Sequence, residues 1–431
     1  MLKKLTFLAF ILLFAVPSFG ENPITRQMDP RNIDFYLLTV GLGTGIAERY
    51  GHTMIRIVDR ESLKETNINW GMFNFADPYL PLNFFLGKLR YWVNHESSRH
   101  LYQRYQYYEK RPVVSEKINL TDGQKIELFE LIMENLEPKN RHFWYQYFYK
   151  NCSTIPRDYL DQALQGAIMK RFDAEISDTN FRNYVRVNLN RPPVIAFFLD
   201  IVMNARLDAP LPKWAEMFYP PKLREYLMTM PAFNDAGEPI ADSKLLTDTK
   251  VIVDLPDVPE DPWSMHPWFL SLNLLGLILG FGLINKKGKE KTKMKLHRLG
   301  RAIVGLFLGF WSLFAGILGV TMLSTWMFSA HLDLYHNANL FLFWPIDLVF
   351  LIPSWSFLFA KEPGPPSRLI RATYYIALAH LLIIPVWVLG CVSGLISQNC
   401  NWVILYIAPV AAVNFFLLIY DYRQRIENTQ E

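Results

Sequence analysis

The stretch AIVGLFLGFWSLFAGILGVTMLSTWM, residues 302–327, shows what kind of protein this chain is. It contains no charged residue and exceeds the roughly 20 apolar residues that a helix needs to cross a bilayer. Four more apolar blocks of spanning length lie at residues 267–285, 338–360, 372–390 and 402–420. The sequence therefore predicts an all-α bundle of five transmembrane helices over residues 267–420.

The basic residues between these blocks predict how the bundle is oriented. The loop between the first two blocks contains Lys286, Lys287, Lys289, Lys291, Lys293, Lys295, Arg298 and Arg301. Loops rich in Lys and Arg stay in the cytoplasm, whereas residues 328–337 and 391–401 contain neither residue type. The part of the chain before the bundle is then exported, and residues 421–431 form a cytoplasmic tail. The net charge of +4 follows from this topology, and the sequence has no nucleic-acid-binding motif, so no nucleic-acid partner is expected.

The first 20 residues are typical of a signal peptide. Lys3 and Lys4 precede a short apolar run, and Ser18 and Gly20 precede a plausible cleavage point at Glu21. The alternative is an uncleaved first membrane helix, but the apolar run is short for a span. We therefore predict a signal peptide at residues 1–20, an exported domain at 21–253 and an extended linker at 254–266, where Pro residues recur at every third position.

The exported domain is predicted to begin with strands and to continue with helices. Residues 35–40, 52–60 and 67–75 have strand-like patterns, and the last two are predicted to form a hairpin around a polar turn. Thr121 and Gln124 form a capping-box pattern ahead of an amphipathic helix. A further helix is expected at about 156–164, and residues 205–265 look irregular.

Cys152 is the cysteine of this domain that stands out. Cys391 and Cys400 share a predicted outside loop, where oxidising conditions permit a disulfide, which leaves Cys152 alone. An unpaired cysteine in an exported domain indicates a reactive thiol, although a buried inert cysteine is the commoner outcome. Cys152 precedes a helix start marked by Ser153 or Thr154 as cap, where a helix dipole favours a thiolate.

His52 is the candidate base for this thiol. It begins a strand directly after Gly51, where the small neighbour leaves the ring access to a cleft. An imidazole can accept a thiol proton and return it to the leaving group. Eight other histidines lie at membrane edges, in a span, in the cytoplasmic loop or in polar surroundings, so context favours His52 without excluding a structural role.

Several short runs of residues resemble one protein family. They are Leu37-Leu38-Thr39, Tyr50-Gly51-His52-Thr53, Asn69-Trp70-Gly71, Phe85-Leu86-Gly87-Lys88 and Asn151-Cys152-Ser153-Thr154 with Arg157-Asp158. Their order is similar to the N-terminal periplasmic domain of Lnb-type lipoprotein N-acyltransferases, over roughly residues 33–200, and the attached bundle resembles the membrane domain of that family. The resemblance implies an α+β papain-like domain of the permuted NlpC/P60 type ahead of the five-helix transmembrane bundle.

The resemblance also implies an activity and a location. Cys152 would attack a glycerophospholipid acyl donor to form a thioester, with His52 as base, and the amino group of a diacylated lipoprotein would accept the acyl chain. No cofactor or metal is expected, and the protein would lie in the bacterial inner membrane. Asn69 is our choice for an orienting third residue, with Asn67 nearly as good and ordinary polar roles as the alternative.

Further polar residues are expected to support the site or the bundle. Tyr50, Asn151 and Arg157 are more suited to substrate binding or support than to chemistry. Asp347, His380 and Asn414 lie within three predicted spans, roughly 12 to 18 Å from their outer ends at the helical rise. At this similar depth, the three side chains are expected to be able to contact one another inside the bundle. The structural explanation is that they form hydrogen bonds between helices, and the functional alternative is that they line a pocket for a lipid headgroup.

Other functions use the same pair of residues. A cell-wall peptidase of the NlpC/P60 type would share Cys152 and His52, but it seldom needs five membrane helices. A phospholipase would differ only in using water as the acceptor. A non-enzymatic envelope assembly protein would carry Cys152 as an inert residue.

Overall fold

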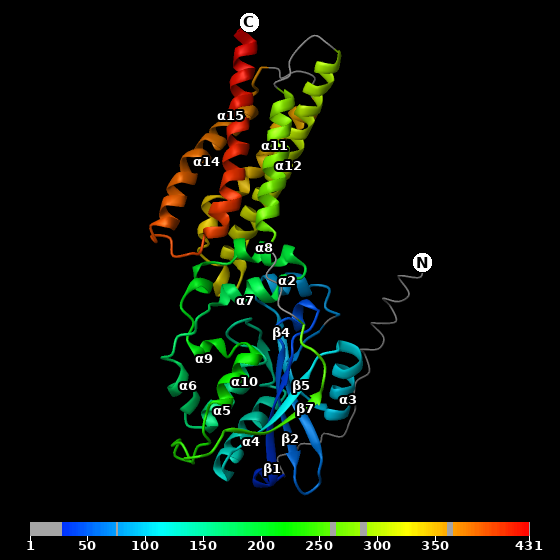
Figure 1. The fold of residues 1–431 in the computed structure, drawn as a ribbon, viewed down its shortest axis with the longest axis vertical. Helices are drawn as coiled ribbons and strands as arrows, with labels where there is room; N and C mark the ends of the chain where they lie inside the picture. Colours follow the sequence, from blue (N-terminus) through cyan, green and yellow to red (C-terminus); the bar gives the residue numbers. More distant parts are fainter. Residues whose placement is uncertain (1–27, 75, 259–263, 285–290, 360–364, 431) are drawn as a thin grey trace, which may run out of the picture.

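The computed structural model describes residues 28–74, 76–258, 264–284, 291–359 and 365–430. They form a sheet domain, residues 28–258, and a helical bundle, residues 264–430, which stand end to end along the long axis of the molecule (Figure 1). The predicted signal peptide and the central part of the predicted linker lie outside the described residues.

The sheet domain is built on one seven-stranded sheet in the order β6-β4-β3-β2-β1-β5-β7, in which every neighbouring pair is antiparallel. Its strands are β1 (Ile33–Val40), β2 (His52–Asp59), β3 (Glu65–Met72), β4 (Arg90–Ser97), β5 (Val113–Ile118), β6 (His142–Trp144) and β7 (Leu246–Val253). The hairpin predicted from residues 52–75 is present as β2 and β3, whose register pairs Ile55 with Ile68. Alternating apolar residues on these strands supply the core.

Helices cover both faces of the sheet. They are α2 (Leu80–Phe85), α3 (Ser98–Gln103), α4 (Asp122–Leu136), α5 (Thr154–Ala163), α6 (Ala167–Phe172), α7 (Phe181–Asn188), α8 (Pro193–Val202), α9 (Lys213–Glu216) and α10 (Pro220–Met228). The main core lies between the sheet and α4, α5, α6 and α10. A smaller core lies on the opposite face, under α3 and the π-helical turn η3 (Arg104–Glu109). The capping box predicted at Thr121 and Gln124 starts α4.

Residues 205–253 are more regular than the sequence indicates. Strand β7 extends the sheet by pairing with β5, and α9 and α10 precede it. The pattern conceals β7 because it is an edge strand, whose middle residues are exposed and polar rather than alternately apolar. The short apolar helix α8 was also not expected, and it lies at the end of the domain that faces the bundle (Figure 1).

Among its described residues, the bundle contains four helices that are long and apolar enough to cross a membrane, or up to five if one bent pair counts as a span. Its helices are α11 (His266–Ile284), α12 (Lys291–Phe328), α13 (Leu351–Phe359), α14 (Arg368–Val392) and α15 (Ala408–Gln430), the last preceded by η8 (Val403–Ile407). The block predicted as one helix at 338–360 is instead bent by 50° between Leu332–Phe341 and Pro345–Phe359. Pro345 begins the second piece, where its missing N–H costs no hydrogen bond.

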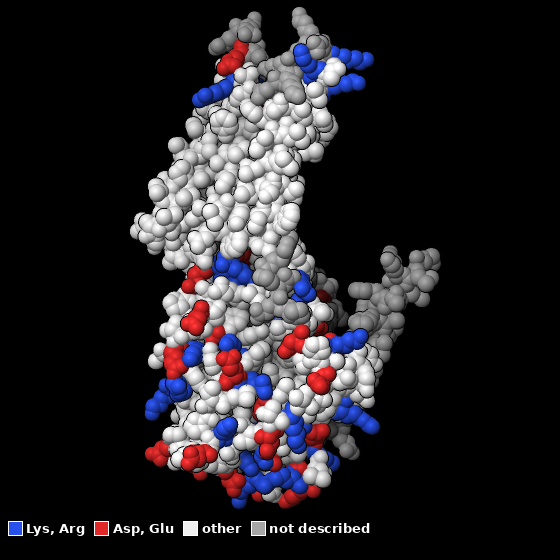
Figure 2. Space-filling view, in the orientation of Figure 1, with Lys and Arg blue, Asp and Glu red and all other residues white. Residues whose placement is uncertain are grey.

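The distribution of charge agrees with the predicted orientation. Lys and Arg gather at the end of the bundle far from the sheet domain, and a band free of charge separates that end from the sheet domain (Figure 2). Such a band matches the hydrocarbon region of a bilayer. Residues 285–290 of the basic loop lie outside the described residues, but α12 begins with Lys291 and Lys293 from the same loop.

The sheet domain is hydrogen-bonded to the loop after α12. The N–H of Ala330 donates to the carbonyl oxygen of Leu86 over 2.8 Å, and the N–H of Asn204 donates to that of Asp333 over 2.8 Å. The hydroxyl of Tyr149 donates to a carboxylate oxygen of Asp333, also over 2.8 Å. These contacts place the sheet domain directly on the outer end of the bundle.

A buried ionic network joins the same two parts. The Arg182 side chain is fully buried and pairs with Asp208 at 2.6 Å and with Asp200 at 3.3 Å. Asp208 also accepts from the N–H of Asn399 in the loop before η8, and Asp200 lies 3.2 Å from the ring of His266 at the start of α11. Because a buried charge is costly when unpaired, this network favours the docked arrangement.

Candidate active site

Cys152 lies in the tight turn that leads into α5. The Oδ1 atom of Asn151 accepts hydrogen bonds from the N–H groups of Ser153 and Thr154 at 2.8 and 2.9 Å. Ser153, expected as a cap, makes no side-chain capping bond, because its hydroxyl donates to the carbonyl oxygen of Met217. Asn151 is therefore the residue that caps the helix and holds the backbone on both sides of Cys152.

Asn151 also ties this turn to other segments. Its Nδ2 atom donates to the carbonyl oxygens of Tyr147 and Phe218 at 2.9 and 3.0 Å. The side chain thus uses both its donor and its acceptor atoms and is buried. The supporting role predicted for Asn151 fits this geometry.

His52 is the first residue of β2, where it pairs with Val40 of β1. The preceding Gly51 has a φ of +77°, a conformation that side-chain-bearing residues rarely adopt. The ring lies against Gly71 of β3, so closely that a Cβ there would be 2.5 Å from the His52 Cε1 atom. Gly51 and Gly71 therefore allow the imidazole to occupy this position, the first through its backbone conformation and the second by leaving space for the ring.

Asn69 orients the His52 ring. Its Oδ1 atom accepts a hydrogen bond from the Gly71 N–H at 2.8 Å and lies 2.9 Å from His52 Nε2. Because Oδ1 only accepts, Nε2 must carry the proton, which leaves Nδ1 with the lone pair. The structure thus brings together His52 and the third residue that the sequence favours, although the catalytic role of Asn69 stays a prediction.

A chain of polar contacts stands behind Asn69. Its Nδ2 atom donates to a carboxylate oxygen of Glu96 at 3.4 Å, and Glu96 pairs with Arg104 at 2.8 Å. Asn67, the alternative third residue, instead donates to Ser98 and to the backbone of Glu96 and is fully buried. Asn67 therefore supports the sheet, and the choice falls on Asn69.

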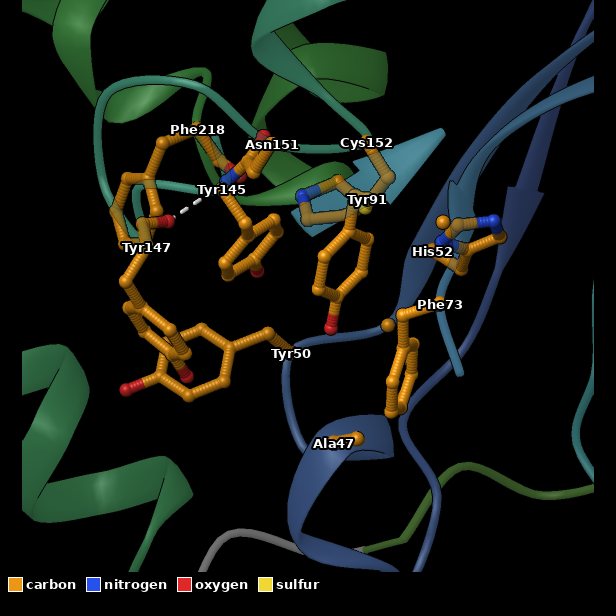
Figure 3. A pocket seen from close by; sticks show the side chains of 13 residues that line it. Ala47, Tyr50, His52, Phe73, Tyr91, Tyr145, Tyr147, Asn151, Cys152 and Phe218 are labelled. Carbon is orange, nitrogen blue, oxygen red and sulfur yellow. Dashed lines mark hydrogen bonds between the residues drawn. The ribbon is translucent and has the colours of Figure 1, made fainter. Parts of the chain in front are cut away.

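Cys152 and His52 line one pocket of about 90 Å³. They reach it from the turn before α5 and from β2, and Figure 3 shows the tyrosine rings gathered around the same space. The pocket wall is largely aromatic and is formed by Tyr50, Phe73, Tyr91, Tyr145, Tyr147 and Phe218. The thiol and the imidazole make no direct hydrogen bond, which is common before a substrate draws catalytic groups together.

Burial keeps both groups neutral. It raises the pKa of the Cys152 thiol to about 11, against the opposing effects of the Thr53 N–H and the Arg111 charge. Burial and Arg111 lower the pKa of His52 to about 3, although the hydrogen bond with Asn69 opposes this shift. The expectation that the helix dipole favours a thiolate stays a prediction, and burial opposes it by raising the pKa of the thiol.

Two other predicted site residues differ in their relation to the pocket. Tyr50 lines it, with its ring at 4.8 Å from that of Tyr147, and burial raises the pKa of its hydroxyl well above the ordinary value. Arg157 does not line it. Its guanidinium binds the carbonyl oxygen of Trp214 at 2.7 Å and lies over the Trp214 ring, so it supports the packing behind the site.

Sequence reasoning missed the aromatic wall and Arg111. Tyr91 comes from β4 and stacks on Tyr145 with ring centroids 4.3 Å apart, and Phe218 comes from a distant turn. The aromatic run at 143–149 was the one local signal for part of this wall. No local sequence signal pointed to Arg111, because only the fold brings it near His52.

The predicted intramembrane residues are brought together in part. His380 Nε2 lies 2.7 Å from Asp347 Oδ1, and both side chains are fully buried. Asn414 is buried too, but its amide donates to the carbonyl oxygen of Val410 in its own helix. The Asp347 and His380 contact joins α14 to the bent segment before α13. Cys391 and Cys400 are free thiols here, so the suggested disulfide is not formed.

Within the described residues, no group of three or more His, Cys, Asp or Glu side chains is arranged to hold a metal ion. The fold and the site define a multi-pass membrane protein with an antiparallel-sheet periplasmic domain that contains a half-buried thiol and imidazole pair. Residues 20–184 match the family model described as the Lnb N-terminal periplasmic domain. No curated protein and no solved structure matched the chain.

The matched region includes His52, Asn69 and Cys152. It ends within α7, so β7 and α10, which complete the sheet and its main core, lie beyond it. The resemblance inferred from short runs of residues is confirmed for this region. The five-helix bundle is not covered by the match.

Proposed function

We propose that the protein is a lipoprotein N-acyltransferase in which Cys152 is the nucleophile and His52 the base. The observation that carries the proposal is the shared pocket, in which the tautomer set by Asn69 leaves His52 Nδ1 free to accept a proton. The domain match and the position of the pocket in a domain docked on a membrane bundle support it. The chain order, in which His52 and Asn69 precede Cys152, supports a permuted papain-like arrangement of the NlpC/P60 type.

The proposed first half-reaction forms a thioester. The Cys152 sulfur attacks the ester carbonyl of a glycerophospholipid while His52 Nδ1 takes the thiol proton. The carbon–oxygen bond then breaks, and the lysophospholipid oxygen leaves with the proton from His52. Because both groups are neutral at rest, the proton moves during the attack rather than before it.

The proposed second half-reaction transfers the acyl group to an amine. The α-amino group of a diacylglyceryl-cysteine attacks the thioester carbonyl, His52 accepts a proton from the nitrogen, and the carbon–sulfur bond breaks. The proton returns to the Cys152 sulfur.

Substitution of the two reacting residues tests the proposal. We expect Cys152→Ser and His52→Ala each to lower acyl transfer by at least about 1,000-fold, because removal of either member of such a pair disables the whole unit. Mass spectrometry of lipoprotein N-terminal peptides measures the product, and the intact mass of the purified protein detects an acyl group on Cys152. Circular dichroism and membrane insertion serve as controls for folding.

The outcomes separate the alternatives. Full activity of Cys152→Ser would leave an envelope assembly role, and unchanged lipoprotein acylation without the gene would exclude the transferase. Steady release of free fatty acid without any acceptor would indicate a phospholipase. Cleavage of cell-wall peptides by the wild type, lost in Cys152→Ser, would indicate a peptidase.

A further inference from the structure

A second pocket, of about 160 Å³, lies on the other side of β4 from the Cys152 pocket. Arg90 and Trp92 of β4 pair with Trp144 and His142 of β6. Because side chains alternate along a strand, these four share one face, opposite to Tyr91, which lines the Cys152 pocket. Asn74, Asp77, Leu80, Asn83, Lys88 and Leu89 line the rest of the second pocket.

This second pocket lies beside the outer end of the bundle. The carbonyl oxygens of Phe84 and Leu86 accept from the His331 ring and the Ala330 N–H over 2.7 and 2.8 Å. Gly87 lies so close that a Cβ there would be 2.9 Å from the His331 nitrogen. Lys88, which lines the pocket, comes next in the chain. In Figure 1, α2 lies at the end of the sheet domain that faces the bundle.

The pocket wall carries two basic side chains, Lys88 and Arg90, against one acidic side chain, Asp77, so these charges leave it net positive. Among the described residues, neither Lys88 nor Arg90 forms an ion pair or a side-chain hydrogen bond. The acidic residue in the wall, Asp77, uses its carboxylate to accept from the Tyr79 N–H and the Asn83 amide. The pocket therefore offers cationic groups to a ligand while its carboxylate is engaged.

A third basic group, His142, lies in the same wall. Burial and the positive charges of Arg90 and Arg141 lower the pKa of His142. At neutral pH the His142 ring is therefore uncharged, and the positive charge of this wall comes from Lys88 and Arg90. The site thus favours a negatively charged ligand over a neutral one.

Exposed apolar and aromatic side chains surround the pocket. Tyr79, Leu82 and Phe84 of the α2 segment and Trp144 of β6 are all exposed. Aromatic residues with basic neighbours are typical of the headgroup level of a membrane. This combination fits a lipid surface better than a soluble anion.

We propose that Lys88, Arg90 and His142 bind the phosphodiester headgroup of an anionic phospholipid in the outer face of the membrane that the bundle spans. The exposed side chains of α2 and Trp144 enter the interface around that headgroup. Because the two pockets share β4, this contact also holds the Cys152 pocket at the lipid surface. The binding is independent of acyl transfer and does not require it.

Binding of a soluble lipid to the full chain in detergent tests the inference. Isothermal titration with dihexanoylphosphatidylglycerol, inorganic phosphate and dihexanoylglycerol separates headgroup, free anion and acyl contributions, and the Cys152→Ser background removes any reaction. We expect the double variant Lys88→Gln with Arg90→Gln to bind the phosphatidylglycerol about 10- to 30-fold more weakly, since each basic residue at a membrane surface contributes a few-fold. Lys88→Arg with Arg90→Lys should retain binding.

A matched control keeps the test specific. Lys64→Gln with Arg99→Gln removes one Lys and one Arg from exposed positions outside the pocket, and it should bind like the parent protein. Equal losses in both double variants, or no loss in the pocket variant, would overturn the inference. Inorganic phosphate that binds as tightly as the lipid would overturn the assignment to a headgroup. Failure here leaves thioester formation at Cys152 untouched, so the two proposals fail separately.

Discussion

At rest, the thiol of Cys152 and the imidazole of His52 are both uncharged. In a solvated site, an imidazole beside a thiol can take its proton to form an imidazolium–thiolate ion pair. In this pocket, burial penalises both charged forms. Asn69 holds the tautomer and Arg111 contributes a nearby positive charge that favours a developing thiolate. In the proposed reaction the thiol proton therefore moves to His52 as the sulfur attacks the ester carbon, and not before.

The rate of thioester formation should be independent of pH between about 5 and 8. His52 must be neutral to accept the proton, and its pKa of about 3 keeps it neutral throughout this range. An ordinary histidine would lose activity as the pH falls through about 6.5. Single-turnover acylation with a short-chain ester measures this step without the amine of the acceptor. A half-loss of rate near pH 6.5, with the protein still folded, would contradict the buried neutral base.

At the scale of elements, three strands and one helix turn hold the site. Strand β2 supplies His52. The pairing of β3 with β4 changes register between Asn69 and Met72, and here Asn69 and Gly71 face the His52 ring. Asn151 fixes the turn before α5 and so positions Cys152. A bulge beside an active site commonly re-aims a side chain in this way.

Gly71→Ala should disable the site and leave the fold nearly intact. The new Cβ would lie 2.5 Å from His52 Cε1, so the ring must move away. A displacement of about 1 Å at a reacting group costs on the order of 100-fold in rate. Thioester formation and the thermal midpoint report the two effects. Gly282→Ala, which meets no atom within 4 Å, is the matched control, and equal rates for both variants would refute the argument.

The whole molecule couples the sheet domain to the membrane. The Arg182 network and the loop after α12 hold the domain on the outer end of the bundle. Within the bundle, the contact between His380 and Asp347 connects α14 to the bent segment. A buried pair of this kind is costly to break from one side, because the remaining group is left buried without its partner.

Asp347→Ala should destabilise the full chain by about 3–5 kcal/mol, the usual cost of removing one member of a buried pair. The exposed Asn401→Ala, at the outer end of the bundle, should change stability little. Thermal unfolding in detergent measures both. If Asp347→Ala altered neither stability nor acyl transfer, neither the helix-joining role nor a headgroup role for this residue would stand.

The sequence by itself determined the features that local patterns encode. Uncharged blocks such as residues 302–327 predicted membrane helices, basic loops predicted their orientation, and the Thr121 and Gln124 spacing predicted a helix start. Alternation predicted the hairpin of β2 and β3. These signals depend on neighbours a few residues apart, so no tertiary contact is needed to produce them.

The tertiary structure alone decided how distant segments meet. It chose Asn69 over Asn67, because the two amides share a strand face and only the packing against His52 and Ser98 distinguishes them. It also placed Tyr91 and Phe218 in one pocket wall and buried the Cys152 thiol enough to raise its pKa. Register, burial and the docking of α8 on the bundle arise from contacts across the whole chain, which no short stretch of sequence contains.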